Sequence, residues 1–208
     1  MLTRGNLLII VERVTELLST GKLNALLAEF MPLNEVEVTS APPSLFDEVR
    51  TFHAASLGGE YYEAFRGHSN NGYDQSRGTD AFIAEFDRLT RQCIRATKTV
   101  PPLDVRETFE RLFDVLRHID KGNDDIVFFA DEGGPSEVGI DWRSVFPVYF
   151  RCLALTASAH VFAQMVDQVI RDFADFERPT HLQAARRAAN PAQKAALRAL
   201  PSSPSDKR

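Results

Sequence analysis

The sequence has few cysteines and no long apolar run, and each lack excludes a class of protein. Only two cysteines, Cys93 and Cys152, occur in 208 residues, too few and too far apart for a disulfide framework or a four-ligand zinc site. The N-terminal apolar run from Leu7 to Val11 ends at Glu12, which is too short for a signal-peptide core or a membrane span. We therefore expect a cytoplasmic protein with reduced thiols and no membrane association.

Catalytic signatures are also missing. The five histidines form no His-x-x-x-His or His-Glu-x-x-His arrangement of the kind that zinc enzymes use. The stretch GHSNNG at 67–72 lacks the second glycine of a Gly-x-Ser-x-Gly nucleophile motif, because Asn71 stands in its place. No glycine-rich phosphate loop precedes a predicted helix. We therefore expect a non-enzymatic protein without a cofactor.

The composition is that of a globular protein with an uneven charge. Hydrophobic residues make up 44% of the chain and charged residues 25%, and fifteen phenylalanines accompany a single tryptophan, so a core rich in phenylalanine is expected. The net charge is −5, yet residues 178–208 carry seven Lys or Arg and one Asp. Because the acidic body repels polyanions, only this basic segment is suited to nucleic acid.

Apolar residues at helical spacing predict an all-α fold of about eight or nine helices. The helices fall at 7–18, 23–30, 45–57, 79–94, 105–119, 144–157, 158–173, 179–189 and 191–200. Ser44, Ser158 and Asn190 are expected N-caps. The helix at 144–157 is apolar on nearly every side, which is typical of a central helix, and Pro147 is expected in its first turn. We predict antiparallel helical hairpins packed around this central helix.

The predicted organisation has three parts. A single helical domain is expected at 1–177, a basic, alanine-rich helical extension at 178–200, and a disordered tail at 201–208. Within the domain, a Gly133-Gly134-Pro135 turn separates two short apolar runs. Periodicity does not distinguish helix from strand at 126–130, so a short β-hairpin at 126–140 stays open as an alternative.

Acidic residues gather around the Gly133-Gly134 turn. Carboxylate oxygens are the ligands that hard divalent cations prefer, although the spacing does not match a calcium loop. One alternative is therefore a metal-dependent enzyme, and the other is a solvated acidic surface with helix caps. The metal ligands would be drawn from Asp124, Asp125, Asp131, Glu132 and Asp141.

Two regions of opposite charge predict a binding function. The basic helical segment is suited to docking on a partner or on the acidic stretch, and the polar stretch 67–78 offers a third alternative, a small-ligand site. The leading expectation is an adaptor or scaffold that binds a protein partner or self-associates. The candidate binding residues are Asp131, Glu132, Asp141, Trp142, Arg186 and Arg187.

One resemblance accompanies these patterns. The runs DDIVFFADEGG at 124–134, VGIDWRSVFPVYFRCL at 138–153 and ADFERPTHLQAARRAAN at 174–190 are similar to an uncharacterised group of mostly helical bacterial proteins. The similarity covers about residues 120–200. It implies a helical fold, and it carries no activity, cofactor or site residue that could be transferred to this chain.

Overall fold

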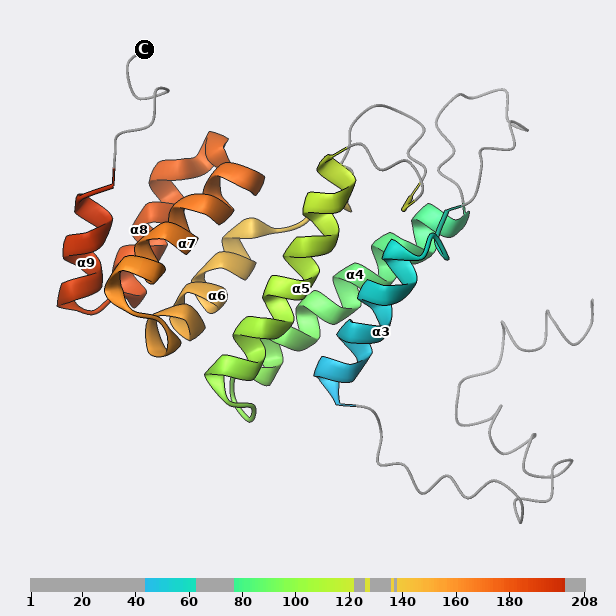
Figure 1. Cartoon of the computed structure of the whole chain (residues 1–208), viewed down its shortest axis with the longest axis horizontal. Helices are drawn as coiled ribbons and strands as arrows, with labels where there is room; N and C mark the ends of the chain where they lie inside the picture. The colour runs from blue at the N-terminus through green and yellow to red at the C-terminus, as the bar shows by residue number, and fades with distance from the viewer. Residues whose placement is uncertain (1–43, 63–76, 122–125, 128–135, 137, 201–208) are drawn as a thin grey trace, which may run out of the picture. The chain divides into compact units, whose positions relative to one another are not determined.

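The computed structural model describes residues 44–62, 77–121, 126–127, 136 and 138–200. Contacts divide the chain into two compact units, Met1–Pro42 and Pro43–Arg208, and every described residue belongs to the second. The described residues form seven α-helices and a short 3₁₀ helix, η2 (Figure 1). They are α3 (Leu45–Leu57), α4 (Arg77–Ala96), α5 (Pro102–Asp120), α6 (Trp142–Thr156), α7 (Ala159–Phe173), η2 (Asp175–Glu177), α8 (Arg178–Ala188) and α9 (Pro191–Arg198).

The all-α prediction is confirmed, since the described residues contain no strand. Ile126, Val127, Gly139 and Ile140 lie in neither a helix nor a strand, and Ser136 and Val138 have 3₁₀-helical geometry. The rest of the 126–140 hairpin alternative is outside the described residues. The predicted helices at 7–18 and 23–30 and the tail at 201–208 also lie outside them. No helix in the described ranges is both long and apolar enough to cross a membrane.

Side-chain caps set several helix starts where the sequence predicts them. The Ser44 hydroxyl accepts a hydrogen bond from the Asp47 amide at the start of α3, and the Ser158 hydroxyl accepts one from the Val161 amide at the start of α7. At α9, Asn190 and Gln193 form a reciprocal capping box. These bonds satisfy amide groups that have no partner inside the helix, so they fix where each helix begins.

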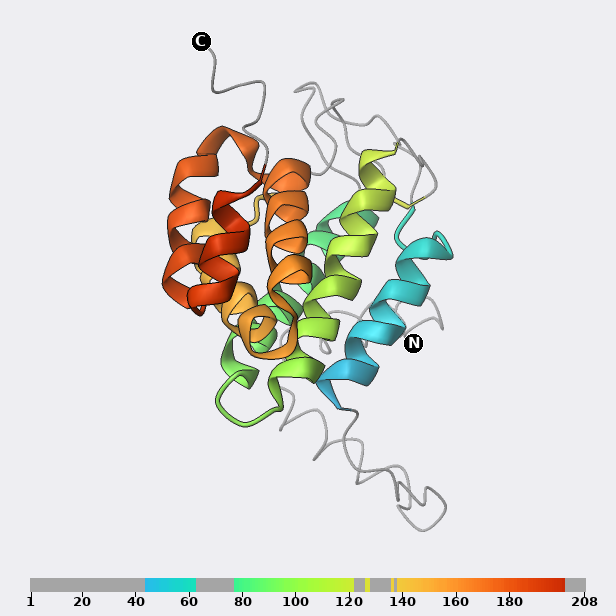
Figure 2. The ribbon, with the colours of Figure 1, turned by 60° about the vertical axis from the view of Figure 1, so that its left-hand side comes forward.

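Successive helices run antiparallel and stack in two layers (Figures 1 and 2). At one end of the α5–α6 pair, Nη1 of Arg106 lies 3.4 Å from Oγ1 of Thr156. At the other end of the pair, the ring centroids of Phe113 and Trp142 are 5.9 Å apart. Helices α3 and α5 pack side by side, as do α6 and α8, and α7 and α9. The predicted arrangement of helical hairpins is confirmed.

Helix α6 lies at the centre of the core, as its apolar sequence predicts. Seven of its residues are buried, and Tyr149 and Phe150 are fully inaccessible. The Phe113 ring of α5 packs edge-on against Tyr149 at 5.1 Å and lies 5.5 Å from Phe173 of α7. Aromatic contacts of this kind add about 0.5–1.5 kcal/mol each to the area they bury. One aromatic cluster therefore stabilises the junction of α5, α6 and α7, and a second, of Phe52, Phe82 and Phe86, joins α3 to α4.

The predicted start of α6 is wrong by two residues. The helix begins at Trp142, because the Asp141 carboxylate caps it, so Pro147 falls in the second turn and not in the first. Proline has no amide hydrogen for the carbonyl of Arg143. The surrounding aromatic packing therefore sustains a helix that the sequence alone would interrupt.

The C-terminal helices belong to the packed structure. Helix α8 packs on α6 and α9 packs on α7, and both contribute fully or nearly fully buried apolar side chains, such as Ala185 and Leu197. The side chain of Gln193 donates hydrogen bonds to the carbonyls of Ala154 and Ala157 at the end of α6. Residues 178–198 therefore complete the core, while the side chains of Arg186, Arg187, Lys194 and Arg198 face solvent.

Candidate functional site

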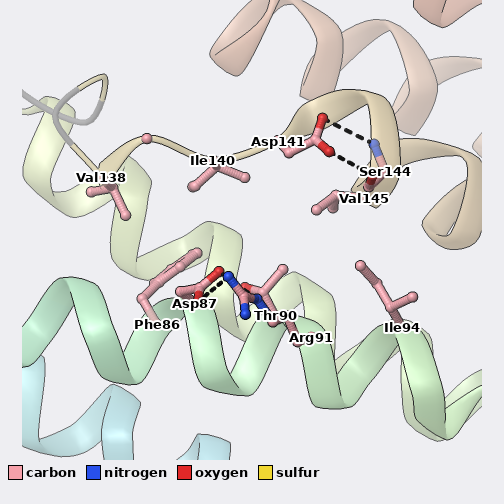
Figure 3. A pocket seen from close by; sticks show the side chains of 11 residues that line it. Phe86, Asp87, Thr90, Arg91, Ile94, Val138, Ile140, Asp141, Ser144 and Val145 are labelled. Atoms are coloured by element: carbon pink, nitrogen blue, oxygen red, sulfur yellow. Dashed lines mark hydrogen bonds and ion pairs between the residues drawn. The ribbon is translucent and has the colours of Figure 1, made fainter.

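A groove lies between α4 and the segment that leads into α6, and we call it the α4–α6 groove (Figure 3). Its volume is about 410 Å³. On α4, Phe86, Thr90 and Ile94 follow one another at four-residue spacing, which places them on one stripe of the helix. The apolar side chains of the groove come from both walls: Phe86, Ile94, Val138, Ile140 and Val145.

The wall opposite α4 depends on a glycine. Gly139 has a φ of 65°, a left-handed conformation that a side chain with a Cβ atom rarely adopts. Its amide donates to the carbonyl of Ser136 at 3.1 Å, which closes a tight turn. Val138 and Ile140, on either side of this glycine, both line the groove opposite α4 (Figure 3).

Asp141 follows this wall and keeps a negative charge at the groove. Its Oδ1 atom accepts the backbone amides of Arg143 at 3.1 Å and Ser144 at 3.3 Å, and its Oδ2 atom accepts the Ser144 hydroxyl at 2.5 Å. The hydrogen bond from the Ser144 hydroxyl is the main reason why the pKa of Asp141 lies below its usual value. Asp141 is therefore ionised at neutral pH, with the α6 N-terminus adding a favourable field.

The α4 wall carries one ion pair at its edge. Arg91 donates through Nε to Asp87 at 3.0 Å, and its Nη2 atom lies 2.9 Å from the second carboxylate oxygen. Both side chains are more than half exposed, so the pair contributes little to stability. Because this pair is neutral overall, Asp141 leaves the charged rim of the groove with one net negative charge.

Thr90 is the unusual polar residue of the groove. The residue is 8% exposed, and its hydroxyl has no hydrogen-bond partner. In the described part of the chain, the only other buried side-chain atoms without a hydrogen-bond partner belong to Gln92 and His181. A buried hydroxyl without a partner costs about 1–3 kcal/mol. Thr90 lies on the groove stripe between Phe86 and Ile94, so the groove combines an apolar surface with an unsatisfied hydrogen-bonding group.

Four of the six predicted binding residues lie among the described residues, and they divide between two ends of the fold. Asp141 lines the groove, whereas the adjacent Trp142 turns into the core and stacks on Phe173 with ring centroids 5.0 Å apart. Arg186 and Arg187 are exposed in the last turn of α8, at the end of the fold away from Asp141. The predicted metal ligands Asp124, Asp125, Asp131 and Glu132 lie outside the described residues, as does the 67–78 stretch up to residue 76.

One other polar cluster contains two of the histidines, His53 and His118, and the carboxylate of Asp114. Among the described residues, no group of three or more His, Cys, Asp or Glu side chains could hold a metal ion. His53 Nε2 lies 2.8 Å from the Asp114 carboxylate, and His118 Nδ1 lies 3.6 Å from the same oxygen. The His53–Asp114 contact joins α3 to α5. Phe86 and Ile94 lie in the helix predicted at 79–94, and the polar Thr90 between them is the one feature of the sequence that distinguishes this stripe from an ordinary apolar face.

Comparison with known proteins adds no relative. No protein family, no curated protein and no solved structure matches this chain.

Proposed function

We propose that this protein is a non-enzymatic interaction module, an adaptor or scaffold, that binds a segment of a partner protein in the α4–α6 groove. The supporting observation is that one hollow holds five apolar side chains and the unpartnered Thr90 hydroxyl. Its volume of about 410 Å³ falls in the range of ligand-binding clefts and accommodates one or two side chains of a peptide. Binding there would bury apolar surface.

The chemistry of the rim specifies the segment. Asp141 is ionised, and the neighbouring Asp87 is already paired with Arg91, so the rim attracts a cation. The partner segment therefore carries an apolar side chain that enters the groove and a Lys or Arg beside it that meets Asp141. In protein interfaces a few buried anchors supply most of the affinity, and complementary charges add specificity.

A peptide selection tests this proposal. A library of random peptides displayed on phage would be selected against the purified full chain, and the enriched peptides titrated by fluorescence anisotropy. We expect enrichment of an apolar residue next to Lys or Arg, with micromolar affinity. Ile94→Trp fills the groove from a half-buried position and should weaken binding at least tenfold, and Asp141→Asn should weaken it several-fold by removing the rim charge.

A matched variant separates the groove from general effects. Gln164→Trp places the same large side chain on the exposed surface of α7, away from the groove, and should leave peptide affinity unchanged. Circular dichroism would verify that each variant is folded. The proposal fails if no peptide is enriched, or if Ile94→Trp binds the enriched peptides as tightly as the unmodified protein.

The remaining expectations from the sequence stay proposals. A metal-dependent enzyme would use the acidic residues outside the described ranges, and thermal unfolding with Mg²⁺, Ca²⁺, Mn²⁺ and Zn²⁺ would reveal a stabilising cation.

We also propose a cytoplasmic location. It is supported by Cys93 and Cys152, which are both free and buried, and burial raises the pKa of Cys93 to about 12. Such a thiol stays protonated and inert at neutral pH.

A further inference from the structure

We infer a second interaction surface, which binds an acidic protein segment at the end of the fold where α6 ends, α8 ends and α9 begins. We call it the basic end. It consists of Arg151 and Leu155 of α6, Arg186 and Arg187 of α8, and Lys194 of α9. It is separate from the α4–α6 groove, whose α6 residues belong to the opposite, N-terminal end of that helix.

Contacts between the three helices bring these residues to one end. Arg143 bonds to Glu177 and the Phe146 ring packs on His181, so α6 and α8 run in the same direction and end together. Gln193 then fastens the first turn of α9 to the carbonyls at the end of α6. Figures 1 and 2 both show the end of α6, the end of α8 and the start of α9 side by side.

The charge at the basic end has no internal compensation. Helices α6, α8 and α9 contain no acidic residue. The acids between residues 142 and 200 lie in α7 and η2 towards the other end, and each forms an ion pair with an arginine. They are Asp167, Asp172, Asp175 and Glu177.

The basic side chains, in contrast, are exposed and form no ion pair with any described residue. The acids nearest to this end on α5 are Asp104 and Glu107, and both line a separate hollow beside α3. Four exposed cations therefore lie at this end of the fold, in a protein whose net charge is −5. Such a local excess attracts an anionic partner over a Debye length of about 10 Å.

The features of this surface favour an acidic polypeptide over other polyanions. Leu155 is 75% exposed one turn after Arg151, so the surface offers an apolar contact beside its charges. Three of the four cations are arginines, whose planar guanidinium groups bind carboxylates and phosphates alike, so the choice between these anions rests on the other features of the surface. No exposed aromatic side chain on α6, α8 or α9 provides a stacking platform for nucleic-acid bases. The occupant is thus a segment with Asp or Glu residues around an apolar side chain.

Fluorescence anisotropy with a labelled twelve-residue peptide of Asp and Glu around a central Leu tests this inference on the full chain. We expect saturable binding that weakens as salt increases. Arg187→Gln should weaken it about three- to fivefold, the size expected for one exposed charge pair. Leu155→Ser should weaken it by a similar factor, and a peptide with Ser in place of Leu should lose that dependence.

Two control variants show whether the peptide binds at the basic end or elsewhere on the protein. Lys121→Gln removes one exposed charge at the opposite end of α5 and should leave the affinity unchanged. Ile94→Trp should also leave it unchanged, so this test is independent of peptide binding in the groove. The inference is overturned if Arg187→Gln and Lys121→Gln behave alike, or if a 20-base-pair DNA duplex or phosphatidylserine vesicles bind more tightly than the peptide through the same residues.

Discussion

Gln193 holds α9 onto the end of α6, and its replacement should destabilise the whole unit. The side chain is 1% exposed and makes three hydrogen bonds. Its Nε2 atom donates to Ala154 O at 2.9 Å and to Ala157 O at 3.2 Å, while Oε1 accepts the Asn190 amide at 3.0 Å. The two carbonyls belong to the last turn of α6 and the residue after it, where a helix leaves acceptors unsatisfied.

The expected loss follows from these three bonds. At about 1 kcal/mol for each, Gln193→Met should lower the free energy of unfolding by about 3 kcal/mol, since methionine keeps the volume but neither donates nor accepts these bonds. For a chain of this length, each kcal/mol lowers Tm by about 2–4 °C, so a fall of about 6–12 °C is expected. The assay is urea unfolding followed by circular dichroism, with Tm from a thermal scan.

The neighbouring Lys194 supplies the control. Lys194→Ala changes an exposed side chain on the same helix and should alter stability by less than about 0.5 kcal/mol. If Gln193→Met is as stable as Lys194→Ala, then the Gln193 bonds do not hold α9, and the assembly of the basic end through Gln193 is refuted.

Two further predictions concern charged groups in α8. Arg178 is 9% exposed and pairs with Asp167 and Asp175, so Arg178→Met should lower the free energy of unfolding in urea by about 2–3 kcal/mol. Arg171 is the exposed partner of Asp167, and Arg171→Met should lower it by less than about 1 kcal/mol. Equal effects of the two substitutions would contradict the buried pairing. His181 is 1% exposed, and burial lowers its pKa below 6.5 in the folded state. The unfolded chain therefore takes up the proton first, and stability should fall as the pH drops from about 6.5 through the folded pKa, by at most about 1.4 kcal/mol per pH unit. His181→Leu should flatten this slope in pH-dependent unfolding, and an unchanged slope would show that another group titrates.

Local signals explain why most of the fold was predictable from the sequence. Three helix starts are marked by capping side chains that accept a hydrogen bond from the amide three positions later: Ser44, Ser158 and Asn190. Because these bonds are local, the helix starts can be predicted without knowledge of the tertiary structure. The start of α6 is harder to predict, because Asp141 belongs in sequence to the acidic stretch and its role as a cap depends on bonds to Arg143 and Ser144. Once the cap is recognised, the position of Pro147 in the second turn follows.

The groove was beyond prediction for a different reason. Whether α4 and α6 close against each other depends on side chains about fifty residues apart and on the conformation at Gly139. An apolar stripe on a helix has the same sequence pattern whether another helix covers it or it lines an open groove. The basic end likewise depends on α6 and α8 running in the same direction, which no local pattern specifies, although the excess of basic residues after 178 was visible.

The serial packing of the helices has a consequence for how the chain acquires its structure. Every pair of helices with extensive contact is separated by at most one other helix along the chain. The loops that close during folding are therefore short, and a low contact order favours rapid folding. Each described helix after α3 emerges from the ribosome when at least one of its partners has already been made, so these helices can assemble in the order of their synthesis, with α9 and its Gln193 packing after α7.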